Sequence, residues 1–143
     1  MTAANLQSPS RPHDPGSARS SSLRTIDTEL AGLGILREAL ANGLADPFAR
    51  AVETIVKATG RVIVTGVGKS GHVGAKIAAT FASTGTPSQY VHPGEASHGD
   101  LGMITEADAV VALSNSGETS ELSDLLQHCR RFSIPLIAIT SRA

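Results

Sequence analysis

The 143-residue sequence lacks the features that mark secreted, membrane-bound or nucleic-acid-binding proteins. It has one cysteine, Cys129, so neither an intrachain disulfide nor a cysteine-based zinc site can form, and a reducing compartment is expected. It contains no apolar run long enough to span a membrane and no hydrophobic core of a secretion signal. Its formal net charge of -1 gives no electrostatic attraction to nucleic acid or an anionic membrane. We expect a soluble, cytoplasmic protein with neither partner.

Aromatic residues are scarce as well. Tryptophan is absent and aromatic residues make up 3% of the chain, whereas 41% of the residues are hydrophobic. Valine, isoleucine, leucine and alanine must therefore fill the core. The single cysteine is expected to be a small apolar residue of a helix rather than a reactive thiol.

The N-terminal part of the sequence consists of a serine- and proline-rich tail followed by two segments with the apolar spacing of helices. Residues 1–22 are rich in serine and proline and nearly free of large apolar side chains, so we expect them to be disordered and assign residues 23–143 to one domain. Two amphipathic helices are predicted to follow. The first carries Leu30, Leu33, Leu40 and Leu44 with a weak point at Gly32 and Gly34; the second starts at Asp46-Pro47, buries Phe48, Ala51, Val52, Ile55 and Val56, and ends at Gly60.

Beyond residue 60, short apolar runs alternate with segments of helical spacing. This alternation is typical of βαβ units, in which right-handed crossover helices connect parallel strands. The sequence therefore predicts an α/β fold: a three-layer, doubly wound parallel sheet with the flavodoxin-like strand order 2-1-3-4. The expected strands are residues 62–65, 88–91, 109–113 and 136–140, and the helices that follow the first and third strands are 70–82 and 119–131.

Two turns rich in glycine and hydroxyl groups follow predicted strands. They are Gly66-Val67-Gly68-Lys69-Ser70-Gly71 and Ser114-Asn115-Ser116-Gly117-Glu118-Thr119. Glycine lets backbone N–H groups point at an anion, hydroxyls add donors, and the start of a helix contributes the positive end of its dipole. In a sheet of order 2-1-3-4 both turns lie at the crevice beyond the carboxyl ends of the strands, bordered by the polar segment 92–100. We expect them to hold one small phosphorylated ligand.

Three other nucleotide or hydrolase motifs do not fit the same residues. The first turn matches G-x-G-x-x-G, but the acidic residue that a dinucleotide site needs at the end of the second strand is absent from Tyr90-Val91-His92. A P-loop would require glycine where Ile63 stands. No G-x-S-x-G elbow is present, so the serines of the second turn are interpreted as hydrogen-bond donors.

With both turns placed, the chain resembles a known family. The motifs that carry the resemblance are Gly66 to Ser83, Ser83-Thr84-Gly85-Thr86-Pro87, His92-Pro93-Gly94-Glu95-Ala96, His98-Gly99-Asp100-Leu101-Gly102 and Ser114 to Glu118. In this order they resemble the sugar isomerase (SIS) domain of D-arabinose-5-phosphate isomerases, over about Leu23 to the last residue. That family's domain continues with a further catalytic glutamate and histidine, a fifth strand and usually a CBS pair, so the resemblance implies a truncated domain and leaves the activity of this chain open.

The resemblance implies an aldose–ketose isomerase that converts D-ribulose 5-phosphate to D-arabinose 5-phosphate for Kdo and lipopolysaccharide biosynthesis in Gram-negative bacteria. It implies a pentose 5-phosphate as ligand, a homo-oligomer and no cofactor. By position, the catalytic residues of that family match Lys69, His98 and Glu121. The family's substrate-contacting segment matches Gly85, Thr86 and His92, and His92 also matches an inhibitory zinc ligand of the family. Together with the two turns, the candidate substrate-binding residues are Gly68, Ser70, Gly85, Thr86, His92, Ser114, Asn115, Ser116, Gly117 and Thr119.

Structural roles remain open for several of these residues. Lys69 could be a solvated surface lysine, and Glu121 could simply stabilise a helix N-terminus. The hydroxyls of the turns could cap helices. His92 and His98 lack a defined third ligand for a metal. His128 is expected at the surface. At the level of function, the alternative is a non-catalytic sugar-phosphate sensor or regulatory module.

Overall fold

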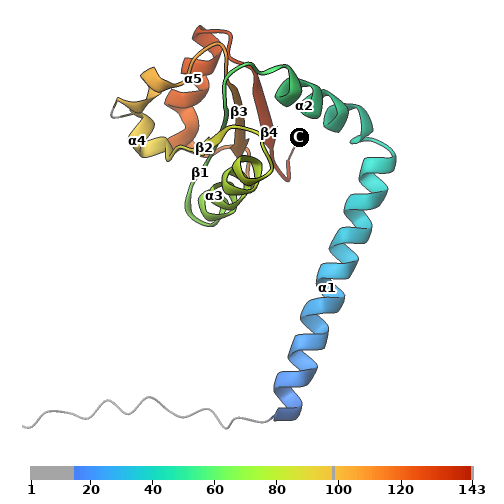
Figure 1. The fold of residues 1–143 in the computed structure, drawn as a ribbon. Coiled ribbons are helices and arrows are strands. Elements are labelled where there is room, and N and C mark those ends of the chain that lie inside the picture. The colour runs from blue at the N-terminus through green and yellow to red at the C-terminus, as the bar shows by residue number, and fades with distance from the viewer. Residues whose placement is uncertain (1–14, 98, 143) are drawn as a thin grey trace, which may run out of the picture. The chain divides into compact units, whose positions relative to one another are not determined.

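The computed structural model describes residues 15–97 and 99–142, and the chain divides into two compact units, Met1–Asp46 and Pro47–Ala143 (Figure 1). The described part of the first unit is largely one helix, α1 (Pro15–Ala41). It runs through both Gly32 and Gly34, so the predicted weak point does not interrupt it.

The predicted disorder of residues 15–22 is wrong, because α1 begins at Pro15. Proline is well suited to a first helical position, and the serine hydroxyls find partners inside the helix. Ser20 Oγ donates to the Gly16 carbonyl at 2.9 Å, and Ser22 Oγ to the Ala18 carbonyl at 3.0 Å. These bonds satisfy the serine hydroxyls without an apolar core, but they do not by themselves favour a helix. The rest of the predicted disordered tail, residues 1–14, lies outside the described residues, and the boundary at residue 23 stays a prediction.

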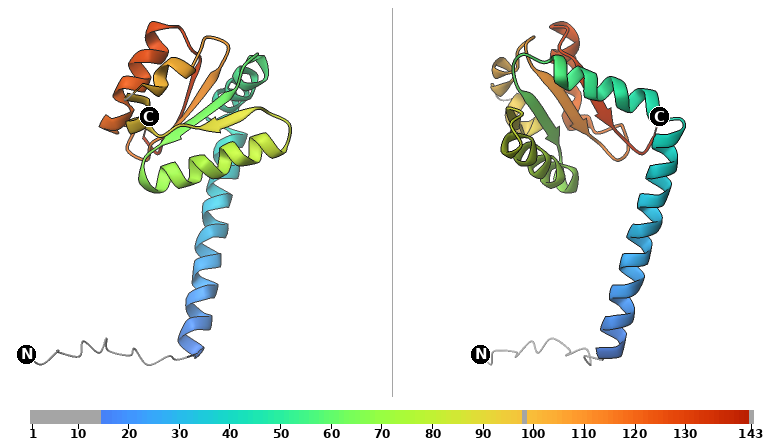
Figure 2. Two further views of the ribbon diagram at one scale, coloured as in Figure 1. Left: turned by 60° about the vertical axis from the view of Figure 1, so that its left-hand side comes forward. Right: turned by 45° about the vertical axis from the view of Figure 1, so that its right-hand side comes forward.

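The second unit is built on a parallel sheet, as predicted. Its strand order in the described residues is β2-β1-β3-β4, and helices cover both faces (Figure 2). The central strands β1 and β3 are paired in register from Val62 opposite Ala109 to Gly66 opposite Leu113. All their residues are buried, which explains their near-continuous apolar sequences. The strands are β1 (Val62–Gly66), β2 (Ser88–Tyr90), β3 (Ala109–Leu113) and β4 (Leu136–Ile139).

Each face of the sheet has its own apolar cluster. Val62 and Val64 of β1 face one side, where α3 (Gly68–Ser83) packs, and Ile55 of α2 (Ala45–Lys57) joins that cluster. Ile63 faces the other side with residues of α4 (Pro93–Ser97) and α5 (Ser123–Arg131). Two 3₁₀ helices, η1 (Asp100–Met103) and η2 (Ser120–Leu122), precede β3 and α5.

Two helix predictions need correction. α2 buries none of its residues fully: Phe48, Val52 and Val56 are exposed, because only the side of the helix that carries Ile55 reaches the sheet. α2 also ends at Lys57, before Gly60. Residues 119–131 do not form one helix, since η2 precedes α5, which starts at Ser123.

Gly60 is needed for a different reason. A Cβ there would collide with Oδ1 of the buried Asp108, whose carboxylate accepts N–H bonds from Arg61 at 2.7 Å and Thr105 at 2.8 Å. This cluster joins the segments that lead into β1 and β3.

Two further predictions concern the surface and the core. Cys129 is buried on α5 and packs in the Ile63 cluster, as expected of an apolar helix residue. His128, expected at the surface, is half-buried, and its Nε2 lies 3.1 Å from the Ile104 carbonyl. Within residues 15–97 and 99–142, no helix combines the length and the apolar character needed to cross a membrane.

Candidate functional site

The first turn leaves its backbone N–H groups open at the start of α3. Gly68 has a φ of 56°, a left-handed conformation that glycine adopts without steric cost. The N-cap residue Val67 is extended and makes no side-chain capping bond. The N–H of Gly71 bonds to the Val67 carbonyl at 3.2 Å. The N–H groups that precede it in the turn are therefore placed to receive an anion, assisted by the dipole of α3.

Tyr90 supports this turn from behind. Its hydroxyl donates to the Gly66 carbonyl at 2.7 Å, and burial raises the pKa of the Tyr90 phenol. The ring lies against glycines of α3: a Cβ on Gly71 would be 2.6 Å from the Tyr90 hydroxyl, and one on Gly74 would be 3.4 Å from the ring. Gly71 and Gly74 thus make room for the tyrosine that fixes the Gly66 peptide.

The second turn is organised by its own hydroxyls. Ser114 Oγ accepts the N–H of Gly117 at 3.0 Å and lies 2.7 Å from Thr119 Oγ1. Ser116 Oγ accepts the N–H of Glu118 at 3.2 Å, and Gly117 has a φ of 75°. Because α5 begins only at Ser123, this turn does not open directly into an α-helix, contrary to the prediction. The N–H groups of Gly117 and Glu118 are bonded to these serine hydroxyls, so the turn offers hydroxyl groups to a ligand in place of a helix dipole.

The structure brings the two turns together. Gly66 and Leu113 are register partners at the carboxyl ends of β1 and β3, and each turn lies at one of these two ends. The approach is close, because a Cβ on Gly66 would lie 3.1 Å from the Leu113 carbonyl oxygen. A single small ligand at this edge of the sheet can therefore face both turns.

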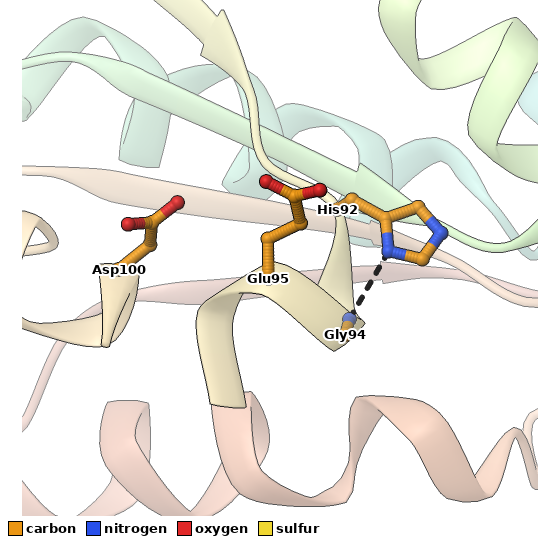
Figure 3. A pocket seen from close by; sticks show the side chains of 4 residues that line it. All are labelled: His92, Gly94, Glu95 and Asp100. Atoms are coloured by element: carbon orange, nitrogen blue, oxygen red, sulfur yellow. Dashed lines mark hydrogen bonds between the residues drawn. The ribbon is translucent and has the colours of Figure 1, made fainter. Parts of the chain in front are cut away.

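A polar cavity of about 450 Å³ lies on the segment that follows β2. His92, Gly94, Glu95 and Asp100 line it, so an imidazole and two carboxylates share one cavity (Figure 3). His92 Nδ1 accepts the N–H of Gly94 at 3.1 Å, which fixes the ring and leaves Nε2 as its outer nitrogen (Figure 3). His98 lies outside the described residues.

Lys69 and Glu121 stand at the starts of the elements after the two turns. Lys69 is exposed in the first turn of α3, where a mobile ammonium can reach a bound anion. Glu121 is exposed in η2; its own backbone N–H, and then the Ser120 hydroxyl at 3.0 Å from Oε2, hold the pKa of this carboxyl below its usual value. The Glu121 carboxyl is therefore ionised at neutral pH, and the lowered pKa makes it a weaker base than a carboxylate whose pKa is raised toward neutrality.

Not all the predicted site residues lie near the turns. Gly85 and Thr86 follow the C-terminal end of α3, and the next residue, Pro87, accepts the N–H of Val62 at 2.8 Å, at the amino end of β1. They are thus at the opposite end of the strands from Ser70, Ser114 and their neighbours. Their role in substrate binding stays a prediction, and within one chain they do not join the two turns.

Metal binding by His92 is also still a prediction. In the part of the chain that the structure describes, no group of three or more His, Cys, Asp or Glu side chains is placed to hold a metal ion. His92 is exposed and its neighbours in the cavity are Glu95 and Asp100.

Comparison with known proteins gives the family. The SIS domain matches residues 54–143, and the chain belongs to this family. It is 56% identical over 123 residues to "Arabinose 5-phosphate isomerase KdsD" of Escherichia coli O157:H7, covering 82% of this chain and 38% of that protein. It is 53% identical over 124 residues to the protein of the same name from Pseudomonas aeruginosa, covering 85% and 38%.

Solved structures agree with the fold. E. coli CFT073 c3406 in complex with arabinose 5-phosphate superposes with a TM-score of 0.78 at 38% identity, covering 90% of this chain and 66% of that one. The phosphoheptose isomerase GmhA of Neisseria gonorrhoeae, at 17% identity and a TM-score of 0.67, shares the fold and covers 83% of this chain and 74% of its own. The chain spans about 38% of the length of the curated relatives named above.

Proposed function

We propose that the chain is the sugar-phosphate-binding part of an aldose–ketose isomerase that interconverts D-ribulose 5-phosphate and D-arabinose 5-phosphate. The observation that carries the proposal is the adjacency of two anion-ready turns at the carboxyl ends of β1 and β3. The names of the relatives, and the neighbouring structure in complex with arabinose 5-phosphate, support the choice of reaction and ligand.

The reaction moves a proton between C1 and C2 of the sugar, while the carbonyl group shifts from one of these carbons to the other. A base removes the proton from C2 of the aldose, the enediolate is stabilised by a hydrogen-bond donor or cation, and the proton is returned to C1. In the proposed assignment Glu121 is the base, Lys69 balances the charge that develops on oxygen, and His98 assists proton movement. Phosphate binding by Ser70, Ser114 and the N–H groups of the first turn fixes the reacting carbons, which lowers the entropic cost of reaching the transition state.

Biological context and assembly belong to the same proposal. We place the chain in the bacterial cytoplasm, in Kdo and lipopolysaccharide biosynthesis, as the resemblance implies. We also propose a homo-oligomer. The exposed row Phe48, Val52 and Val56 on α2 supports it, and a second copy would also give Gly85 and Thr86 a route to a neighbouring site.

Calorimetry and isotope exchange test the proposal together. The 143-residue chain should bind D-arabinose 5-phosphate but not unphosphorylated arabinose, and Lys69→Met should weaken binding about tenfold by removing a cation next to the phosphate. Lys76→Met, at an exposed lysine further along α3, is the matched control and should leave binding unchanged. If the chain binds neither D-arabinose 5-phosphate nor arabinose, the proposal is contradicted.

Exchange of the C2 proton with solvent deuterium separates the catalytic claim from the binding claim. Binding together with exchange supports the isomerase. Tight binding without exchange would favour the alternative, a sugar-phosphate sensor, for this chain.

A further inference from the structure

One face of α1 carries a regular repeat of side chains that are apolar apart from one arginine. The repeat positions, which together form the α1 seam, are Leu23, Ile26, Leu30, Leu33, Arg37 and Leu40. Their spacings alternate between three and four residues, which is the a and d pattern of a coiled coil. Such a seam keeps facing one partner helix along its whole length. The sequence of α1 therefore predicts lengthwise packing against a second helix.

Most of the α1 seam is exposed. Leu23, Ile26, Leu30 and Leu33 are 52–62% exposed, and Leu40 is half-buried. In the described part of the first unit, no other complete helix and no strand is present to cover these side chains. α1 therefore has no apolar core within its own unit, and burying the seam against another helix would stabilise it.

Arg37, the charged position of the seam, indicates the direction of the second helix. A guanidinium in an apolar seam needs a carboxylate beside it, and its own helix does not supply one at the spacings that face it. The residues three and four positions away are Leu33, Gly34, Leu40 and Ala41. In a parallel pair in register, each seam position faces the same position of the other helix, so two copies of Arg37 would meet and repel each other.

An antiparallel pair of α1 helices removes this repulsion. When the two seams overlap along their whole length, Leu23 of one copy lies opposite Leu40 of the other, and Arg37 lies opposite Ile26. Asp27, the residue after Ile26, stands on the flank of the helix that Arg37 of the other copy faces. A carboxylate therefore lies beside the guanidinium, and two-fold symmetry makes the contact twice.

We propose that the α1 helices of two copies of this chain pair in antiparallel direction along the α1 seam, with Arg37 of each copy bonded to Asp27 of the other. The pairing rests on the homo-oligomer proposed above, to which it adds the contact, its direction and its charge pair, and it does not depend on sugar-phosphate binding. A second copy is the occupant because it supplies both a matching seam and the carboxylate. The exposed row on α2, Phe48, Val52 and Val56, has a constant spacing of four residues and offers no matching seam.

Cysteine cross-linking in the full chain tests the contact and its direction. In the antiparallel pair, position 23 of one copy lies beside position 40 of the other, whereas the two positions are about 25 Å apart along one helix. Co-expressed Leu23→Cys and Leu40→Cys chains should therefore form an interchain disulfide under mild oxidation, and neither variant should cross-link to itself. The native Cys129 is 2% exposed, so it does not compete.

Charge reversal tests the ion pair through the yield of the same disulfide. Arg37→Asp alone and Asp27→Arg alone should each weaken the pairing about tenfold, because like charges then meet twice in the symmetric pair. Arg37→Asp combined with Asp27→Arg should restore the yield, which it would not do if either residue had a merely structural role within its own helix. Arg24→Asp, at an exposed position of α1 outside the seam, is the matched control and should leave the yield unchanged.

Three results would overturn the pairing. They are no disulfide between positions 23 and 40 in a chain that light scattering finds to be an oligomer, self-cross-linking of Leu40→Cys, and no recovery in the double charge variant. The first result would mean that the second unit or a different protein covers the α1 seam, and the second would mean a parallel pair. A monomeric wild-type chain would overturn the pairing together with the proposed homo-oligomer. Failure to bind any pentose 5-phosphate would contradict the sugar-phosphate proposal alone.

Discussion

At the scale of single residues, Asp108 connects the two central strands through one buried carboxylate. It is 2% exposed and accepts bonds from the N–H groups of Arg61 and Thr105 and from the Thr105 hydroxyl. Asp108→Asn removes the charge and turns an amide N–H toward these donors. We expect a loss of about 2–4 kcal/mol in the free energy of unfolding by urea titration. Glu106→Gln, at an exposed carboxylate two residues away, should change it by less than about 0.5 kcal/mol.

The same carboxylate predicts how stability depends on pH. Burial acts to raise the pKa of Asp108, but the hydrogen bonds from Thr105 and Arg61 and the charge of Arg61 outweigh it, so the pKa lies below its usual value. A carboxyl with a lowered folded-state pKa stabilises the protein above its unfolded pKa of about 3.9, and that stability is lost as the pH falls through the folded value. Urea midpoints measured from about pH 7 to about pH 3 should fall in the acid range for the wild type and fall less for Asp108→Asn. Parallel loss in both proteins would contradict this.

Tyr90 predicts an effect on anion binding. Tyr90→Phe keeps the ring against Gly74 but removes the bond to the Gly66 carbonyl, so the first turn should become less well ordered. We expect inorganic phosphate to bind about threefold more weakly by calorimetry, with about 1 kcal/mol lost in stability. Ser88→Ala removes a similar bond, 2.7 Å to the Val62 carbonyl, at the other end of β2. It should cost similar stability and leave phosphate affinity unchanged; equal weakening in both variants would refute a positioning role for Tyr90.

At the scale of helices and turns, two glycines inside helices should respond in opposite ways to replacement by alanine. Gly71→Ala in α3 places a Cβ 2.8 Å from the Gly66 carbonyl oxygen as well as against the Tyr90 hydroxyl. It should therefore destabilise the second unit by about 2 kcal/mol or more, measured by urea titration, despite the better helix propensity of alanine. Gly34→Ala in α1 has open space and should increase helix content by circular dichroism. If Gly71→Ala stabilised the second unit instead, the steric conflict with Tyr90 and the Gly66 carbonyl would be refuted.

Elements with strong local patterns can be predicted well from the sequence. The predicted strands agree with the structure to within one residue at each end. The clearest signal comes from β1 and β3, because buried parallel strands are continuous apolar runs bounded by glycine, proline or polar residues. The apolar positions of α2 show its helical period but not how much of its surface the sheet covers, since that depends on tertiary packing. The break between η2 and α5 and the helical state of residues 15–22 are features of the local backbone that composition does not reveal.

The same reasoning explains which parts of the site escape prediction. Glycine and serine spacing locates both turns, and the strand order predicts their adjacency. Tyr90 gives no signal, because a tyrosine in a short strand is ordinary strand composition until its hydrogen-bond partner is seen. Gly85 and Thr86 enter through resemblance alone, although the predicted helix 70–82 and strand 88–91 already place them in the loop that enters the amino end of the second strand, opposite the two turns.

At the scale of the whole molecule, the exposed apolar side chains predict association. Phe48, Val52 and Val56 are 56%, 44% and 77% exposed along α2, and edge strand β4 exposes Leu136 and Ile139. Light scattering should find the 143-residue chain as an oligomer, and Val52→Glu should shift it toward the monomer by placing a charge in the apolar row. Gln127→Glu, at an exposed position of α5, is the control and should not. A monomeric wild-type chain would contradict the proposed assembly.

The lone cysteine of the chain offers a way to time its motions. Cys129 is 2% exposed, and burial raises the pKa of its thiol to about 11, so alkylating reagents can reach a reactive thiolate only when α5 lifts from the sheet. The labelling rate in native buffer therefore measures the population of that open form. If pentose 5-phosphate protects Cys129 while inorganic phosphate does not, the carbohydrate moiety must clamp α5 onto the core from the far end of the strands.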